Sequence, residues 1–168
     1  MAVQATLPTP TIFSPAGVNV SLTHSTAQFK LGTLARGGDG QTWVYCLSSG
    51  THALGALVAI DEDFVSRSAT STNAALASGP GWAQIAFTDG VYGLIATGGR
   101  NLYGKQKDGT AADAQLFTST SVGIMGSTGS AGGPHLMIAG ARNVALSSGA
   151  GAAYEICAVN PHFISPYA

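Results

Sequence analysis

Residues 82–99, WAQIAFTDGVYGLIATGG, constrain the fold most, because two apolar runs flank an Asp-Gly pair. Asp-Gly is a preferred centre for the two-residue type I′ turn that joins antiparallel strands. With Asp89-Gly90 at the turn, the cross-strand pairs are Thr88 with Val91, Phe87 with Tyr92, Ile85 with Leu94 and Ala83 with Ala96. The last three pairs fall on one face, as a buried sheet face requires. The segment therefore predicts a β-hairpin.

Short apolar runs separated by glycine, serine and asparagine continue on both sides of this segment. Residues 42–47 alternate with the period of two typical of a strand, and the glycine-rich residues 37–40 before them predict a hairpin loop. The almost wholly apolar residues 52–60 predict a buried strand, and residues 71–78 allow a turn or two of helix. Later strands are expected at residues 101–106, 114–118, 121–125, 135–146 and 153–160. This spacing predicts an all-β fold, a single-domain β-barrel or β-sandwich.

The two ends of the chain differ from this β-rich body. Residues 1–26 carry three prolines and several apolar side chains, which predicts an extended N-terminal arm that lies on its own barrel or on a neighbour. The β-domain is expected to span residues 27–160. Residues 161–168 are predicted to form an extended C-terminal tail, which docks on a partner or on the body through Phe163, Ile164 and Tyr167.

Charged residues make up 9% of the chain, whereas about 25% is typical of a soluble protein. A free monomer normally covers its outside with such residues, so this chain either presents an outside of Ser, Thr, Gly, Ala and Asn or hides much of its surface against partners. We favour the second alternative. The seven basic and eight acidic residues are scattered along the chain, which argues against nucleic acid as a partner. Neither a membrane-spanning run nor a signal peptide is evident, so the sequence predicts a cytosolic protein in which Cys46 and Cys157 are buried thiols.

Two motifs come close to a known chemical site. Residues 99–106, GRNLYGKQ, have the spacing of a phosphate-binding P-loop up to the last position, where Gln106 replaces the Ser or Thr that holds Mg²⁺. The sequence after them is not helical, so we expect a strand-turn-strand instead. Asp61-Glu62-Asp63 offers oxygen ligands to a divalent cation, but three consecutive acids cannot all face one point. A solvated loop is the better interpretation.

The remaining candidates for catalysis or ligand binding lack the required pattern. No local metal-ligand spacing occurs among the four histidines, which are expected at surfaces or interfaces: His24, His52, His135 and His162. A triad assembled in space stays open, but no serine lies in a nucleophile-elbow pattern. Trp43 and Trp82 lie in predicted strands, where aromatic residues are more often core or interface anchors than the lining of a sugar pocket. The sequence predicts no catalytic, cofactor-binding or metal residues, and a protein that is not an enzyme.

An extended arm is followed by LGTLARGGDGQTWVYCLSSG, an apolar run and then GPGWAQIAFTDGVYGLIATGG. This order of features, over residues 29–99, resembles that of small accessory head proteins of tailed bacteriophages. In several of these a leucine-glycine-threonine run, a glycine-rich turn and an aromatic strand precede an alanine-glutamine segment, a turn and a tyrosine-glycine strand. The resemblance implies a β-rich decoration, or cement, protein that binds the outer surface of a capsid, often as a dimer or trimer.

The resemblance also implies the major capsid protein as partner, the capsid surface as location and the host cytoplasm as the place of assembly. The expected partner-binding residues are apolar and lie near the two ends: Ile12, Phe13, Phe163, Ile164 and Tyr167. Three alternatives stay open. A tail, fibre or head-connector component would share the composition, and a carbohydrate-binding β-sandwich would place a ligand pocket near Trp82. A small trimeric enzyme of the dUTPase type would need carboxylate, serine and phosphate-loop motifs, which are not found.

Overall fold

The computed structural model describes residues 19–37, 40–119, 121–127, 136–144, 147, 149 and 151–164. Residues 1–18 and 165–168, with most of the predicted arm and half of the predicted tail, lie outside this part of the chain. The described elements are nearly all strands, which confirms the predicted all-β class. In chain order they are β1 Thr23–His24, β2 Leu34–Arg36, β3 Thr42–Ser48, β4 Leu57–Ile60, β5 Val65–Ser68, α1 Ser71–Ala74, β6 Gly79–Trp82, β7 Tyr92–Lys105, β8 Gln115–Thr118, β9 Met125–Gly126, β10 Met137–Asn143 and β11 Ala153–Ile164.

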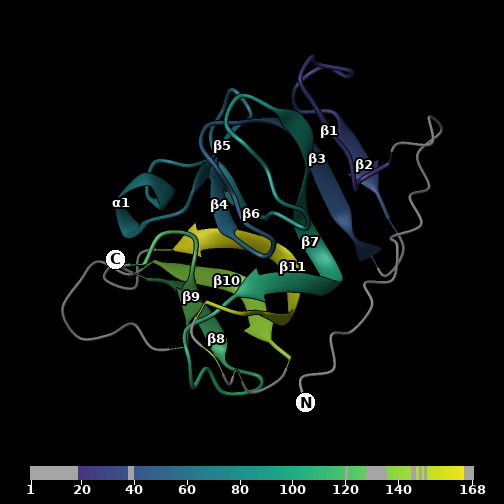
Figure 1. Ribbon diagram of the computed structural model, residues 1–168. Coiled ribbons are helices and arrows are strands. Elements are labelled where there is room, and N and C mark those ends of the chain that lie inside the picture. The colour runs from purple at the N-terminus through teal and green to yellow at the C-terminus, as the bar shows by residue number, and fades with distance from the viewer. Residues whose placement is uncertain are drawn as a thin grey trace.

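Five of these strands close into a barrel, which occupies the upper half of Figure 1. Around the barrel the order is β3, β5, β4, β6 and β7, and β7 pairs back onto β3. The pairing of β3 with β5 is parallel, and the other pairings in the ring are antiparallel. The closing ladder joins Thr42 to Leu47 of β3 with Gly98 to Tyr92 of β7. In a closed ring each strand has a neighbour on both sides, so the barrel needs no further strand to complete it.

Strands β3 and β4 of the barrel are largely buried on both faces, because packing lies inside and outside the barrel, whereas β5 exposes Arg67. The interior is filled by apolar side chains from β3, β4 and β7, among them Val44, Cys46, Val58, Ile60 and Ile95. On the other face of β3, Trp43 and Tyr45 belong to a larger apolar cluster that includes side chains of the second sheet. The alternation predicted for residues 42–47 is therefore present, but both sets of side chains are covered.

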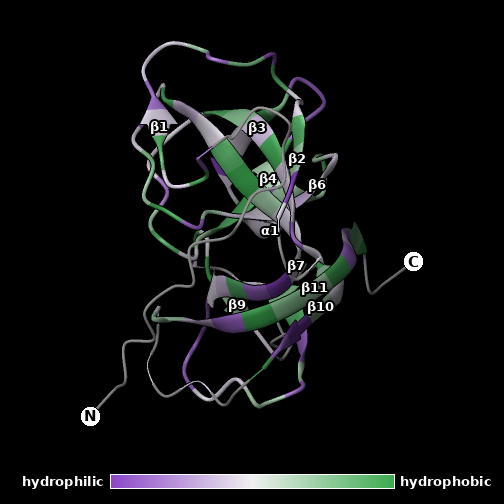
Figure 2. Cartoon of the chain, turned by 90° about the vertical axis from the view of Figure 1, so that its right-hand side faces the viewer, coloured by the Kyte–Doolittle hydropathy of each residue, from purple (hydrophilic) through white to green (hydrophobic). Residues whose placement is uncertain are grey.

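Strand β7 is long enough to leave the barrel and begin a second sheet. Its later residues pair with β11, and the order continues through β10 and β8 to β9. A parallel bridge between Gln106 and Met125 brings β9 back beside the end of β7, so the second sheet curls around its own core. In Figure 2 the barrel strands β3, β4 and β6 lie above β9, β10 and β11. The buried Trp82 indole Nε1 donates to the Met125 Sδ at 3.3 Å and ties the barrel to this sheet.

The joint between barrel and second sheet lies at Gly99, where β7 bends. Gly99 has a φ of +122°, and a Cβ built on it would lie 2.5 Å from the Gln41 Cα. The Gln41 side-chain Nε2 donates to the Arg100 carbonyl at 3.0 Å and fixes the strands at this crossing. Residues 99–105 are thus the bend and second half of β7, and Gln106 follows as an isolated bridge to Met125, so the P-loop-like segment does not open a helix.

The predicted hairpin around Asp89-Gly90 is wrong in its pairing. The turn is present, with Gly90 at a φ of +75°, but the segment before it does not pair with the start of β7. Trp82 is the β6 residue opposite Ala96, and Phe87 pairs with His52 in the loop after β3. The start of β7 pairs with β3 on one side and with β1 on the other. Strand β7 has only two edges, so these two neighbours leave no edge for residues 83–88.

Other elements differ from the sequence predictions mainly at their ends. The buried strand expected at residues 52–60 begins only at Leu57. The short helix α1 starts after Thr70, whose hydroxyl accepts from the Asn73 N–H in a capping box. Strand β11 continues to Ile164, four residues past its expected end at 160, so the first half of the predicted tail belongs to the second sheet. The described end of the predicted arm forms β1, and Val20 just before it is buried in the core.

We expect Gly99→Ala to lower the free energy of unfolding by about 3 kcal/mol or more, because the new Cβ would press on the Gln41 backbone at an unfavourable φ. Gly90→Ala is the matched control. Gly90 also has a positive φ, but a Cβ there meets nothing within 4 Å, so a loss of about 1 kcal/mol is expected. Urea unfolding measures both variants, and equal losses would contradict the close approach at Gly99.

Candidate functional site

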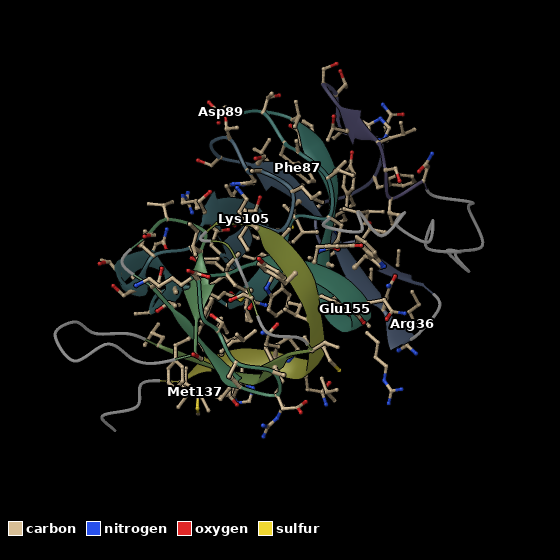
Figure 3. All side chains as sticks on the ribbon, turned by 60° about the horizontal axis from the view of Figure 1, so that its bottom comes forward. Arg36, Phe87, Asp89, Lys105, Met137 and Glu155 are labelled. Carbon is tan, nitrogen blue, oxygen red and sulfur yellow. The ribbon has the colours of Figure 1, made fainter. Side chains whose placement is uncertain are left out.

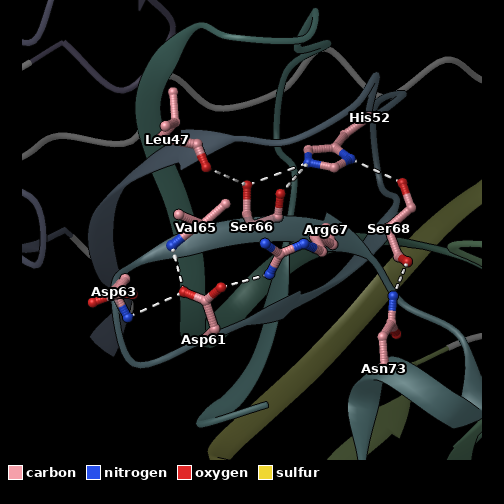
Figure 4. A network of polar contacts seen from close by, with 9 residues as sticks. All are labelled: Leu47, His52, Asp61, Asp63, Val65, Ser66, Arg67, Ser68 and Asn73. Carbon is pink, nitrogen blue, oxygen red and sulfur yellow. Dashed lines mark hydrogen bonds and ion pairs between the residues drawn. The ribbon is translucent and has the colours of Figure 1, made fainter. Parts of the chain in front are cut away.

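A buried histidine, His52, lies in the loop between β3 and β4 and faces strand β5 (Figure 4). Its backbone is fixed by Phe87: the His52 N–H donates to the Phe87 carbonyl at 3.0 Å, and the Phe87 N–H donates back at 2.8 Å. The ring has no exposed surface and lies 6.2 Å from the Phe87 ring, centroid to centroid. The expected surface position is therefore wrong for His52, because the segment around Phe87 covers it.

Two serines of β5 bind the two nitrogens of the His52 ring. The Nε2 atom lies 3.3 Å from the Ser66 carbonyl and 3.2 Å from the Ser66 Oγ, which itself donates to the Leu47 carbonyl. A carbonyl only accepts, so Nε2 carries the hydrogen. Nδ1 is then the acceptor for the Ser68 hydroxyl, 2.8 Å away. Burial lowers the pKa of His52 from its ordinary value of 6.5, although hydrogen bonds to the backbone at Ser66 and Thr51, in which the imidazole is the donor, oppose this.

A serine hydroxyl that donates to an imidazole is the first half of a nucleophile and base arrangement. In catalytic triads the second ring nitrogen is oriented by a carboxylate, whereas here Nε2 faces a carbonyl and a hydroxyl. The ring of His52 is fully enclosed, and Ser66 has no exposed surface. This geometry fits an internal link between the loop and β5 better than general-base chemistry, which needs a substrate within reach of the base.

The acidic residues predicted to form a solvated loop make the turn between β4 and β5. Asp61 Oδ1 accepts from the Asp63 N–H at 3.1 Å and the Val65 N–H at 2.8 Å, and Oδ2 pairs with Arg67. Partial burial alone would raise the pKa of Asp61, but these hydrogen bonds and the Arg67 charge lower it. No group of three His, Cys, Asp or Glu side chains within the described residues converges as metal ligands do. Asp61 therefore acts as a turn-forming residue.

A pocket of about 350 Å³ lies beside this turn, on the Arg67 side of β5. It is lined by residues of β4, β5, the turn and the helical segment: Ala59, Asp61, Glu62, Arg67, Asn73, Leu76 and Ala77. Its main polar groups are already engaged, because Asp61 pairs with Arg67 and Asn73 donates to the Ser68 carbonyl. The pocket holds no aromatic side chain that could stack on a sugar ring.

Both tryptophans are core residues, as the sequence favoured. Trp43 is 1% exposed and Trp82 has no exposed surface, so neither forms the wall of an open sugar site. Both cysteines are free thiols. Cys46 is buried inside the barrel, and burial, aided by the negative charge of Asp61, raises its pKa to about 12. Cys157 is only half-buried, which corrects the prediction that both thiols are enclosed.

The predicted partner-binding residues divide between the described and the remaining chain. Ile12, Phe13 and Tyr167 lie outside the described residues. Phe163 is half-buried and packs against the main core cluster, and Ile164 ends β11 opposite Met137. Phe163 thus contributes to the fold itself, whereas Ile164 is placed at the end of the last strand.

Apolar side chains that the sequence did not single out are exposed on the body. Four of them are more than half exposed and are not part of the arm: Leu34, Leu76, Val122 and Val159. The one ion pair between described residues is Arg67 with Asp61. The described part of the chain thus combines few ion pairs with several exposed aliphatic side chains.

No known family model and no curated protein matches the chain. Within the described residues, no helix is long and apolar enough to cross a membrane.

The buried imidazole makes folding depend on pH. The unfolded chain binds a proton at His52 near the ordinary pKa of 6.5, whereas the folded protein binds it only at lower pH. The free energy of unfolding should therefore fall as pH decreases from 6.5 toward the folded-state pKa, by at most about 1.4 kcal/mol per pH unit. Urea midpoints measured from about pH 7.5 to about pH 5 give this slope.

His52→Gln should flatten the slope, because the amide keeps a donor and an acceptor but does not titrate. His162→Gln is the matched control, since it removes a histidine that is exposed rather than enclosed. Identical slopes in the wild type and His52→Gln would contradict the assignment.

Proposed function

We propose that this chain is a structural virion protein, a decoration or cement subunit that binds the outer surface of a capsid and stabilises the shell. The observation that carries the proposal is the low charge content of the chain, 9% of its residues, together with exposed aliphatic side chains on the parts that surround the closed β-barrel. The resemblance of residues 29–99 to accessory head proteins of tailed bacteriophages supports the same function.

A surface of this kind lowers the cost of docking. Burying a lysine or glutamate side chain requires removal of a strongly held water shell, whereas serine, threonine and alanine lose far less. Exposed side chains such as Leu76, 82% exposed, and Val159, 64% exposed, gain free energy when a partner covers them. A protein that must bind in many copies benefits when each contact has a small desolvation penalty.

Stabilisation of the shell would follow from mass action. A subunit that binds the assembled capsid but not its dissociated parts shifts the equilibrium toward the assembled form, by an amount set by its affinity and concentration. A rigid barrel suits this role, because little conformational entropy is lost when it docks. The proposed partner is the major capsid protein and the location is the capsid surface, reached by assembly in the host cytoplasm.

The contact is proposed to involve the two ends of the chain. Ile12 and Phe13 in the arm, with Ile164 and Tyr167 at the other end, are the residues we assign to it. Strand addition by the arm is a suitable mode, since extended peptides bind the open edges of sheets through main-chain hydrogen bonds. Phe163 is left out of this set because it packs against the core.

Deletion of residues 2–18 should reduce binding to capsids at least about tenfold, because it removes Ile12 and Phe13 from the contact. The deletion stops before Asn19, since Val20 is buried and β1 follows it. Co-sedimentation with capsids assembled without this chain measures the affinity, and thermal unfolding checks that the barrel is intact.

A variant with residues 2–18 replaced by a Gly-Ser sequence of equal length controls for chain length and should bind as poorly as the deletion. Undiminished binding by both variants would exclude the arm from the contact. Localisation of the wild-type chain on the particle by electron microscopy tests the function separately: density on the tail or connector would overturn the capsid assignment.

A further inference from the structure

Strand β2 is an open end of the main strand path. The ten-strand path runs from β2 to β9, and the β9 end is covered because the Lys107 N–H donates to the Met125 carbonyl at 2.8 Å. Among the described strands β2 pairs only with β3, and it lies at the margin of the coloured ribbon in Figure 1. Arg36, its last residue, is likewise at the margin in Figure 3.

The hydrogen-bond pattern shows which groups of β2 face outward. The Thr33 carbonyl accepts from the Tyr45 N–H, and the Gly37 N–H donates to the Gln41 carbonyl, each at 2.9 Å. Antiparallel ladders alternate, so Ala35 bonds to β3 while the N–H and C=O groups of Leu34 and Arg36 point away from it. No described residue bonds to these outward groups.

We propose that β2 pairs with β2 of a second copy of this chain, antiparallel and about a two-fold axis at Ala35. In this register Leu34 of each copy lies opposite Arg36 of the other. Each such pair exchanges two main-chain hydrogen bonds, so every outward group of the two strands is satisfied. A strand whose outward residues are the first and third of three is complementary to itself under a two-fold rotation.

The side chains on β2 suit this arrangement. Leu34 is 74% exposed, and the aliphatic stem of Arg36 from the second copy would cover it. Directly opposed residues are a leucine and an arginine, so no like charges face each other. The ring of Phe64 packs on Gly32, two residues before Leu34, and the exposed acids Glu62 and Asp63 precede it. The turn that carries these acids thus lies beside the start of β2, and in the proposed dimer its charge is opposite to that of the guanidinium of the second copy.

Pairing of this kind closes at two copies, because it consumes the open edge of both. The strand is short, so the contact is smaller than the interfaces of permanent dimers, and a weak dimer is expected. The inference does not depend on the proposed function, since it concerns the purified chain alone.

Leu34→Pro tests the pairing without breaking the barrel, because the N–H that proline removes points away from β3. We expect analytical ultracentrifugation to show a wild-type dimer and at least tenfold weaker dimerisation for Leu34→Pro, since symmetry removes two hydrogen bonds and proline shortens the apolar contact. Near-ultraviolet circular dichroism and the Tm of the monomer should be unchanged. Arg36→Glu, which places a negative charge near Glu62 and Asp63 of the second copy, should weaken dimerisation by a similar factor.

Leu76→Ser is the matched control, because it removes another highly exposed leucine and should leave dimerisation unchanged. A wild type that stays monomeric up to millimolar concentration would overturn the proposal, as would dimers that Leu34→Pro does not weaken. If deletion of residues 2–18 created a dimer that the full chain lacks, the arm of the same chain would be the occupant of this edge and the proposal would be wrong.

Discussion

The pairing of β3 with β7 is the interaction on which the rest of the structure depends. Thr42 and Thr97, whose hydroxyls meet at 3.1 Å across it, are 55 residues apart in the chain. Closing so long a loop has an entropic cost that only an extended ladder with two buried faces offsets. Once the ladder forms, the barrel is closed, and the direction in which β7 leaves it fixes the second sheet. Leu94 in the barrel and Leu102 beyond the bend then share one apolar cluster.

This dependence explains which parts of the fold could be predicted. Composition and the spacing of apolar residues locate most strands. An apolar run such as residues 57–60 must be buried whichever strand it pairs with. Which strand pairs with which cannot be read from such local patterns. Asp89-Gly90 is locally a good hairpin centre, but the space over Gly93 is filled by the Phe87 ring, 2.6 Å from where a Cβ would lie. Phe87 can pack across β7 only because it is held by the His52 loop, and that contact is invisible in a local pattern.

The same distinction separates the polar residues. The role of Asp61 is local, since its partners Asp63, Val65 and Arg67 lie within six residues, and a turn could be inferred from the sequence. The role of His52, in contrast, depends on residues that are distant in the chain. Its partners are two serines of β5, and β5 comes near the loop only because it runs parallel to β3 in the barrel. The sequence shows a histidine at the start of an apolar run and, further on, two serines two residues apart. Neither feature predicts that the histidine contacts the serines.

The distribution of the few charges bears on how such a surface can exist without uncontrolled association. Closing the barrel and covering β9 remove most strand edges, which are the commonest sites of aggregation. Two edges remain among the described strands, those of β1 and β2; β2 ends in Arg36, while Lys105 and Lys107 lie beside the covered end of the second sheet. Charge placed at edges limits open-ended strand addition, and faces of serine, threonine and alanine can be covered at low desolvation cost. A chain with 9% charged residues can thus avoid fibres while its broad faces stay suited to a specific partner.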